Sequence, residues 1–243
     1  AHYLEGTVQH DVMEPGRGIG FKKGDSFFAS FSGTKPEKFL FNDAYKLNHV
    51  WEFGNHISIS TGFTYFKRET AGTLVFNKTG IHAGETLPRI VTNDVDLQLR
   101  WAPNENFYYR NLTRTPIIDK YPVFTLQYNQ GIKGFLGGEY NYSALRLAAS
   151  KRLFLNQLGT ADLTLGVGKI WGALPYPLLE IPNVQIEQDR HTVDYFMMNS
   201  MEFAADRYVK FAIDHRLQGF LLNKIPLIKK LRWRELWRLR MFY

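Results

Sequence analysis

The sequence predicts an all-β fold, and more specifically an antiparallel transmembrane β-barrel. The first observation is a side-chain period of two, in which polar and apolar residues alternate along one segment after another. The second is that glycine, proline, asparagine and aspartate separate these segments. The third is an aromatic content of 15%. Strands explain part of this content, and aromatic girdles at two membrane interfaces would explain the rest.

The clearest strand is predicted in the stretch YVKFAIDHRLQGF, residues 208–220. Its apolar residues alternate with a polar set that includes Lys210, Asp214 and Arg216. A helix would mix these two sets around its circumference, whereas a strand sends successive side chains to opposite faces. The 13 residues would span roughly 40 Å at about 3.3 Å per residue, which is enough to cross a bilayer with tilt.

The same alternation recurs in about ten to twelve segments. In chain order, the examples are HISISTGFTYF (56–66), VDLQLRW (95–101), VFTLQYNQ (123–130), LRLAASKR (145–152), DLTLGVG (162–168) and WRLRMFY (237–243). No long segment has a helical period. A sandwich, a soluble barrel with a ligand cavity and a membrane barrel all fit this pattern. The polar set mixes charged residues with glycine and serine, which favours a wet lumen and therefore the membrane barrel.

The composition allows one large domain, and we expect residues 1–243 to form a single outer-membrane β-barrel domain. The chain is 44% hydrophobic and contains no run of 18 or more apolar residues, so a transmembrane helix is not expected. Cysteine is absent, which excludes disulfides and thiolate chemistry. The sequence begins at Ala1 with no initiator methionine and no signal segment, so we expect a mature or trimmed product.

A group of cations lies near the C-terminus, in NKIPLIKKLRWRELWRLR, and includes Arg238 and Arg240. Those that we expect to contact anionic lipid headgroups are Lys224, Lys229, Lys230, Arg232 and Arg234. The alternative is an ordinary solvated turn between two strands. DNA binding is less favoured, because no helix-turn-helix, zinc finger or RNA-binding strand motif accompanies the cations. The expected partners are therefore outer-membrane lipid and lipopolysaccharide, with other envelope proteins as further candidates and no nucleic acid.

A second polar group is predicted to line the lumen or to anchor a loop. It consists of Glu202, Asp206, Arg207, Lys210, Asp214 and Arg216. The same region offers the best case for an enzyme, because Ser200 and His215 lie nearby. In a strand, however, Asp214 and His215 face opposite ways and cannot form a pair of base and orienting group. We therefore expect a charged structural cluster and no catalytic residue.

The sequence predicts neither a metal nor a cofactor. Seven histidines are scattered along the chain, and none stands at metal-ligand spacing from another. The glycine-rich stretches GRGIGF (16–21) and GVGKIWG (166–172) lack the P-loop pattern and a following helix. Glycines on one strand face more often permit curvature or close packing.

Three motifs resemble an uncharacterised Bacteroidota outer-membrane family. They are PYPLLE (175–180), MNSMEFAADRY (198–208) and IPLIKKLRWRE (225–235). In that family the similar region is a C-terminal barrel, usually preceded by a carboxypeptidase-regulatory-like domain in the periplasm. The resemblance is clearest over residues 91–236 and implies a location in the bacterial outer membrane. A more distant similarity, in the order of corners and turns, links the chain to the barrels of BamA-type insertases and two-partner-secretion transporters.

The chain departs from that family after the Trp-Arg-Glu turn, where members continue through further strands and this chain passes directly into WRLRMFY. Whether the barrel is complete in this chain stays open. The family has no activity that can be carried over to these residues. We therefore expect a non-catalytic outer-membrane barrel with a polar lumen that acts in envelope biogenesis or transport. Two alternatives stay open: a barrel hydrolase that acts on lipid, and a soluble β-barrel that binds a ligand or acts in adhesion.

Overall fold

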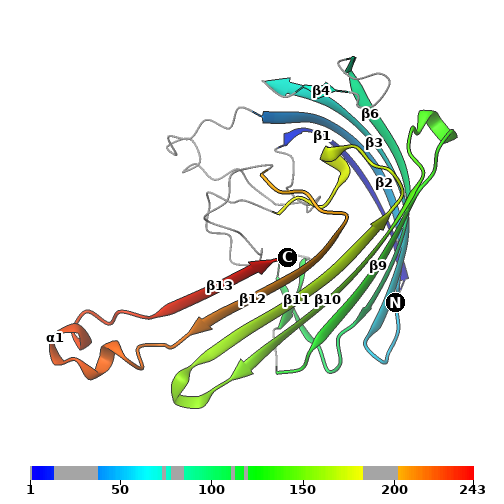
Figure 1. Cartoon of the computed structure of the whole chain (residues 1–243). Coiled ribbons are helices and arrows are strands. Elements are labelled where there is room, and N and C mark those ends of the chain that lie inside the picture. The colour runs from blue at the N-terminus through cyan, green and yellow to red at the C-terminus, as the bar shows by residue number, and fades with distance from the viewer. Residues whose placement is uncertain are drawn as a thin grey trace.

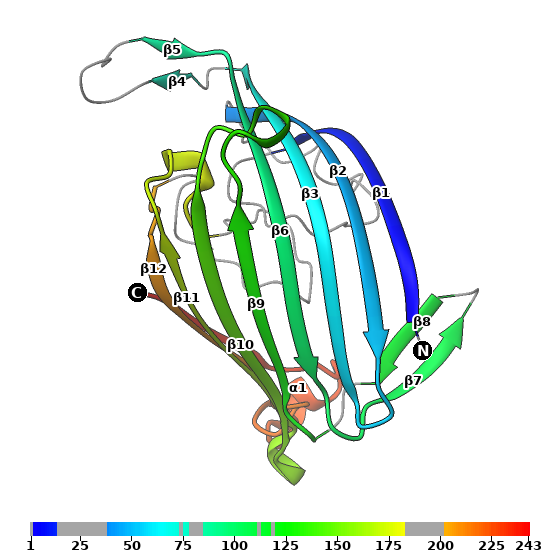
Figure 2. The same ribbon diagram turned by 90° about the vertical axis from the view of Figure 1, so that its right-hand side faces the viewer.

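One curved antiparallel sheet dominates the fold. The computed structural model describes residues 2–13, 38–72, 75–77, 85–110, 113–117, 120–182 and 202–243. Within these ranges, nine strands form a sheet that bends around a concave side and does not close on itself (Figures 1 and 2). The predicted all-β, antiparallel fold is therefore confirmed.

The strands follow the order β1-β2-β3-β6-β9-β10-β11-β12-β13 across the sheet, and every neighbouring pair is antiparallel. Their bounds are His2–Met13 (β1), Lys38–Glu52 (β2), Ile57–Gly72 (β3), Arg89–Trp101 (β6), Val123–Gly131 (β9), Tyr142–Phe154 (β10), Thr160–Trp171 (β11), Arg207–Arg216 (β12) and Leu236–Phe242 (β13). The order along the chain is thus also the order in space, as expected for strands joined by hairpin connections.

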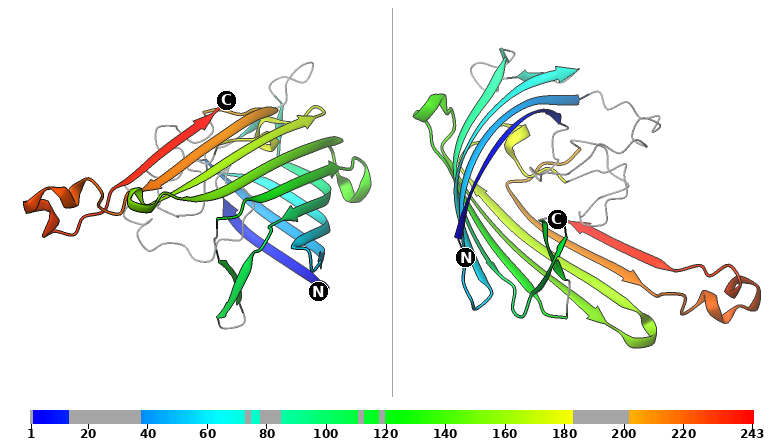
Figure 3. Two further views of the ribbon diagram at one scale, coloured as in Figure 1. Left: turned by 90° about the horizontal axis from the view of Figure 1, so that it is seen from below. Right: turned by 180° about the vertical axis from the view of Figure 1, so that it is seen from behind.

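Short strands and helical turns lie in the connections between these strands. Two small hairpins are formed by β4 (Phe76–Asn77) with β5 (Thr86–Leu87) and by β7 (Asn106–Arg110) with β8 (Thr113–Ile117), and the second stands away from the sheet (Figure 3). The helical turns are η3 (Phe135–Gly137), η4 (Asn156–Leu158), η5 (Tyr176–Leu178), η6 (Leu222–Lys224) and α1 (Pro226–Lys229). In the described part of the chain, no helix has the length and apolarity needed to cross a membrane.

The pairing register joins one alternate set of side chains from all nine strands into a single polar face. For example, Arg152, Asp162, Asp214 and Arg238 lie opposite one another across β10, β11, β12 and β13. This face is the concave one, because the segment after β11 folds inside the curve of the sheet (Figure 1) and contacts it there through Glu180. The other alternate set forms the convex face, which is largely apolar.

The buried apolar core of the described residues is small. Leu40, Phe76 and Ile90 form its centre, and Leu87, Tyr140 and Leu178 pack against it. Leu178 belongs to η5, so this core lies where the inner segment meets the sheet. Most large apolar side chains of the strands are instead exposed on the convex face, among them Leu97, Leu147, Leu165, Val209 and Leu239.

The strand predicted over residues 208–220 is shorter than expected. β12 ends at Arg216, and the chain then turns with positive φ at Gln218 (52°) and Gly219 (90°). Leu217 is buried at this turn instead of continuing the convex apolar set. The period of two continues past Arg216 in the sequence, but backbone N–H groups of the turn bind the Glu235 carboxylate, and this interaction ends the strand.

Candidate functional site

The structure brings together part of the predicted polar cluster. Lys210, Asp214 and Arg216 all lie on the concave face of β12. Arg207 pairs with Lys169 in the convex set, so the structure does not bring it to the same face. Asp206 precedes β12, and its backbone carbonyl accepts a hydrogen bond from the N–H of Ile170 (2.6 Å). Glu202 is exposed in the segment that leads to the strand.

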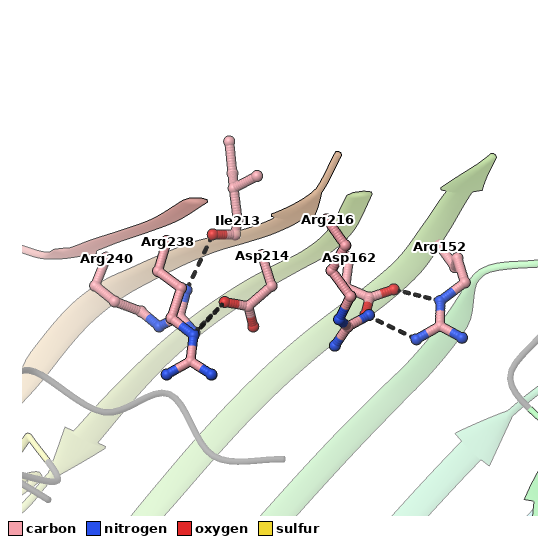
Figure 4. Close-up of polar contacts among 7 residues, drawn as sticks. All are labelled: Arg152, Asp162, Ile213, Asp214, Arg216, Arg238 and Arg240. Carbon is pink, nitrogen blue, oxygen red and sulfur yellow. Dashed lines mark hydrogen bonds and ion pairs between the residues drawn. The ribbon is translucent and has the colours of Figure 1, made fainter. Parts of the chain in front are cut away.

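Two aspartates face each other on the concave side and are held by arginines. Asp162 accepts two hydrogen bonds from Arg152, from Nε (2.5 Å) and Nη2 (2.8 Å), and a third from Nη1 of Arg216 (2.7 Å) (Figure 4). Asp214 accepts one from Nη2 of Arg240 (2.7 Å), and Nε of Arg238 lies 3.5 Å from the same carboxylate. Like charges directly opposite on neighbouring strands repel each other, so these cations are needed for the two carboxylates to coexist. The sequence did not single out Asp162. It placed Arg152 in the polar set of one strand and Arg238 and Arg240 among the cations near the C-terminus, but it predicted no contact of these arginines with an aspartate.

A third carboxylate comes from the inner segment and not from a strand. Glu180 forms ion pairs with Lys210 and with Arg146, whose Nε lies 3.5 Å from its Oε2. Its backbone exchanges two hydrogen bonds with Ala205 (3.1 and 3.0 Å). The PYPLLE corner and the segment before β12 are thereby joined, which gives a physical role to two of the sequence motifs. Residues 183–201, with Ser200, lie outside the described residues.

The polar contacts continue across the sheet from Arg146. Its Nη1 donates to Oδ1 of Asn129 (2.7 Å), Asn129 donates to Asp96, and Oγ1 of Thr64 donates to Oδ2 of Asp96 (2.7 Å). This chain of hydrogen bonds links β10 to β3 along one face. Buried polar groups that bind one another in this way satisfy donors and acceptors that would otherwise be costly to bury.

Glycines on the concave face allow close cross-strand packing of aromatic rings. A Cβ atom added at Gly168 would lie 2.5 Å from the ring of Tyr208, which is buried and stacks on Phe242 at 5.9 Å between ring centroids. The GVGKIWG stretch therefore serves packing, as predicted. The GRGIGF stretch lies outside the described residues.

The predicted headgroup-binding cations lie in the loop between β12 and β13, which extends beyond the sheet (Figures 1 and 3). Lys229, Lys230 and Arg232 are exposed. Two others are engaged: Nζ of Lys224 lies 4.1 Å from the centre of the Phe220 ring, and Arg234 donates to the backbone carbonyl of Gln218. The same loop exposes apolar side chains, with Leu227 80% exposed and Trp233 57% exposed.

Glu235 fixes the shape of this loop. Its carboxylate accepts hydrogen bonds from the backbone N–H groups of Gly219 (2.6 Å), Leu221 (3.0 Å) and Leu222 (2.5 Å). Partial burial raises the pKa of Glu235, but these backbone donors lower it more, so that its pKa lies below the ordinary value. The IPLIKKLRWRE motif thus ends in the residue that closes the turn.

A continuous apolar band crosses the convex face. Register pairs Ile59, Leu99, Leu126, Leu147, Val167 and Val209 in one row from β3 to β12. Apolar and aromatic residues extend from this row along each strand, and on β10 they extend as far as Lys151; hydroxyl groups among them belong to Thr61, Tyr65 and Tyr128. Trp101 and Phe124 stack at 5.7 Å between ring centroids at one margin. A shallow groove of about 400 Å³ between β6, β9, β10 and β11 is lined almost entirely by these side chains.

The other margin of the band slants across the strands. Its first polar side chains, from β3 to β12, are Lys67, Asn93, Gln130, Ser143, Lys169 and Arg207. Lys67 lies eight residues beyond Ile59, the row residue of its strand, whereas Arg207 lies two residues beyond Val209. On the strands between β3 and β12, the number of residues between the row and the first polar side chain decreases in steps without reversing. A shift of six residues over five strand spacings corresponds to about 20 Å over about 24 Å, or a slant of roughly 40°.

The residues considered for catalysis do not form a triad-like arrangement in the described part. Asp214 binds arginines on the concave face, whereas Nε2 of His215 contacts the backbone carbonyl of Leu158 (2.9 Å). The predicted opposite orientation of these two side chains is confirmed. The described residues contain no group of three or more His, Asp and Glu that could hold a metal ion.

Comparison with known proteins identifies the family. Residues 22–243 match the C-terminal domain of a family of unknown function, DUF5686, and the chain belongs to this family. The match covers most of the chain and begins well before residue 91, and the family is an uncharacterised one, as the motifs predicted. No curated protein matches the chain.

Proposed function

We propose that this member of the DUF5686 family forms the wall of a bacterial outer-membrane β-barrel and acts without catalysis in envelope biogenesis or transport. In this proposal the convex face contacts lipid and the concave face lines a polar lumen. Outer-membrane lipid and lipopolysaccharide are the partners of the convex face, and other envelope proteins are candidate partners of the lumen and loops.

The slanted margin of the apolar band is the observation that carries this proposal. Strands of membrane barrels tilt by about 35–45° from the barrel axis. A band that lies level in the membrane must therefore slant by the same angle relative to the register rows. The margin from Lys67 to Arg207 slants by roughly 40°, as a level lipid boundary on tilted strands requires.

The height of the band also supports a lipid-facing surface. On β3, the convex residues run from Ile57 to Tyr65, with Thr61 among them, and end before Lys67. These eight residue steps cover about 26 Å along the strand, which corresponds to about 20 Å along the membrane normal at a tilt of roughly 40° and approaches the apolar band of roughly 25 Å on outer-membrane barrels. Aromatic residues such as Trp101 and Trp237 lie near one margin, where amphipathic rings favour the membrane interface.

The polarity of the two faces argues against a soluble ligand-binding barrel. Such a barrel places its apolar side chains inside, around the ligand. Here the concave side carries Asp162, Asp214 and their arginines, while Leu97 and Leu165 are exposed on the convex side. A large exposed apolar surface on a water-soluble monomer would promote association.

The loop between β12 and β13 fits the interface at one end of the barrel. It combines exposed Leu227 and Trp233 with the cations Lys229, Lys230 and Arg232. Apolar and aromatic side chains insert into the headgroup region, and lysine and arginine bind anionic lipid at the same depth.

Fractionation tests the proposal directly. The full chain would be expressed with an outer-membrane signal sequence, and the membrane fraction would be extracted with alkaline carbonate. The expected result is a protein that stays in the outer membrane after extraction and shifts in mobility when heated before electrophoresis. A monodisperse, water-soluble protein without detergent would contradict the proposal and favour the soluble alternative.

A further inference from the structure

We propose that four arginines at one end of the concave face form a binding site for a phosphate-type oxyanion. The site consists of Arg152, Arg216, Arg238 and Arg240, arranged around Asp162 and Asp214 (Figure 4). The inference deepens the proposed function and rests on it, because the site lies on the face that would line the lumen.

The register places the site on four neighbouring strands. Arg152, Asp162, Asp214 and Arg238 form one row, so the two carboxylates are direct cross-strand neighbours with an arginine on either side. Arg216 and Arg240 extend toward the same carboxylates from adjacent rows. Six ionised groups are thus gathered on one patch of the concave face.

Within the described residues, arginines outnumber the carboxylates of the patch. Four arginines surround the two carboxylates of Asp162 and Asp214. Four guanidinium groups also carry about twenty N–H donors, and two carboxylates offer only about eight lone-pair sites.

Arg240 is held in place by the protein. Its Nη1 donates to the backbone carbonyls of Ile213 (3.1 Å) and Leu239 (3.0 Å), and its Nη2 donates to Asp214. The side chain is only 10% exposed, and its buried Nε has no hydrogen-bond partner among the described residues. A guanidinium fixed in this way keeps its charge at the patch, and little entropy is lost when an anion binds nearby.

Arg216 and Arg238 provide the accessible part of the site. Their side chains keep 36% and 28% of their surface exposed, more than those of Arg152 and Arg240. The planar fork of a guanidinium matches two oxygens of a phosphate group, and arginine is less strongly hydrated than lysine. These properties favour a phosphate group over a halide as the ligand.

The surrounding charges draw anions to the same end of the molecule. The loop between β12 and β13 begins directly after Arg216 and carries Lys224, Lys229, Lys230 and Arg232. Clustered charges of one sign beside a concave surface raise the local concentration of oppositely charged ligands. The loop would therefore deliver anions to the arginine site.

Titration calorimetry on the full chain, folded in a non-ionic maltoside detergent, tests the inference. The probe is inorganic pyrophosphate, added at constant ionic strength in sodium chloride. Arg216→Gln and Arg238→Gln should each weaken binding by about five- to tenfold, because each removes one charge-assisted contact. Lys46→Gln, which removes one charge elsewhere on the concave face, should change the affinity by less than about twofold. Circular dichroism checks that all variants remain folded.

A second arm identifies the source of the phosphate group. Phosphatidylglycerol would be added to the micelles, with phosphatidylcholine as the control. Competition by phosphatidylglycerol alone would assign the site to lipid headgroups, and lack of competition would assign it to soluble phosphorylated ligands. Absence of pyrophosphate binding, or equal weakening by Lys46→Gln, would overturn the inference. Neither result would affect the membrane-wall proposal, because no bilayer is used.

Discussion

The convex and concave faces of the sheet are built from the same nine strands, but their side chains differ in what they contact. On β6, Asp96 faces the concave side and binds Thr64 and Asn129. Its neighbour Leu97 faces the convex side and is 45% exposed. The concave face therefore finds its partners within the protein, whereas the convex face needs an apolar environment that the described residues do not provide. In our proposal, lipid is that environment.

The largest expected effect comes from placing the same charge on either face. Leu97→Arg should destabilise the protein in phospholipid bilayers by about 2–4 kcal/mol, because an arginine near the bilayer midplane is costly. The matched variant Gln98→Arg places the charge on the concave face and should cost less than about 1 kcal/mol. Urea titration of the two variants folded into liposomes measures both values.

That pair of variants can also break the comparison. Equal stability of Leu97→Arg and Gln98→Arg in liposomes would contradict a lipid-facing convex surface. If Leu97→Arg were more soluble than the unchanged protein in water without detergent, and lost no stability, the soluble alternative would be favoured.

A second prediction tests whether the concave face is packed like a protein interior. Gly168→Ala should destabilise the fold by about 1–3 kcal/mol, because the new methyl group must displace the Tyr208 ring. Gly166→Ala is the matched control, because its nearest neighbour, Cβ of Lys210, would lie at 3.7 Å. Thermal or urea unfolding in detergent should therefore separate the two alanine variants. An equally tolerated methyl group at both positions would show that this face is loosely packed.

A third prediction concerns the arginine–aspartate pairs. Arg152→Met should cost about 1–2 kcal/mol, because Asp162 would keep only Arg216 of its described arginine partners and would still face Asp214. The double variant with Asp162→Asn should recover part of this loss, since the repulsion with Asp214 disappears as well. Urea unfolding of the four proteins in a double-mutant cycle gives the coupling. A coupling near zero would mean that water already screens the pair.

The smallest expected effect is local to the loop between β12 and β13. The pKa of Glu235 is lowered in the folded protein, so the stabilisation is present above its ordinary pKa and is lost as the pH falls through the folded value. Hydrogen exchange at Gly219, Leu221 and Leu222, corrected for intrinsic rates, should accelerate below about pH 4.5. Glu235→Gln should show fast exchange already at neutral pH. Protection that does not change with pH would exclude this role for Glu235.

The sequence predicts the two faces well, because a strand fixes the direction of each side chain through its period of two. Lys210 and Asp214 lie on the concave face as expected, and His215 lies on the other. The pairing register is not contained in this local pattern. The slanted margin from Lys67 to Arg207 could therefore not be predicted, since it appears only when neighbouring strands are aligned.

Contacts between distant segments could not be predicted from the sequence for the same reason. Glu180 meets Lys210 only because the segment after β11 folds back inside the curve of the sheet. Arg238 and Arg240 alternate with apolar residues at the end of the chain, and their partner Asp214 lies on another strand. The end of β12 was mispredicted because Glu235, far along the chain, binds the N–H groups of the turn.

The slanted margin can be measured directly, because the chain contains no cysteine. Single cysteines would replace the margin residues Lys67, Gln130, Ser143, Lys169 and Arg207, and the fully buried Asn93 would be left unchanged. Each would be labelled with a fluorophore in liposomes, and its depth would be measured by quenching with spin-labelled lipids. Our account predicts one common depth for all five, although they lie two to eight residues from the same register row. Depths that follow the register rows, or labels that no lipid quencher reaches, would contradict it.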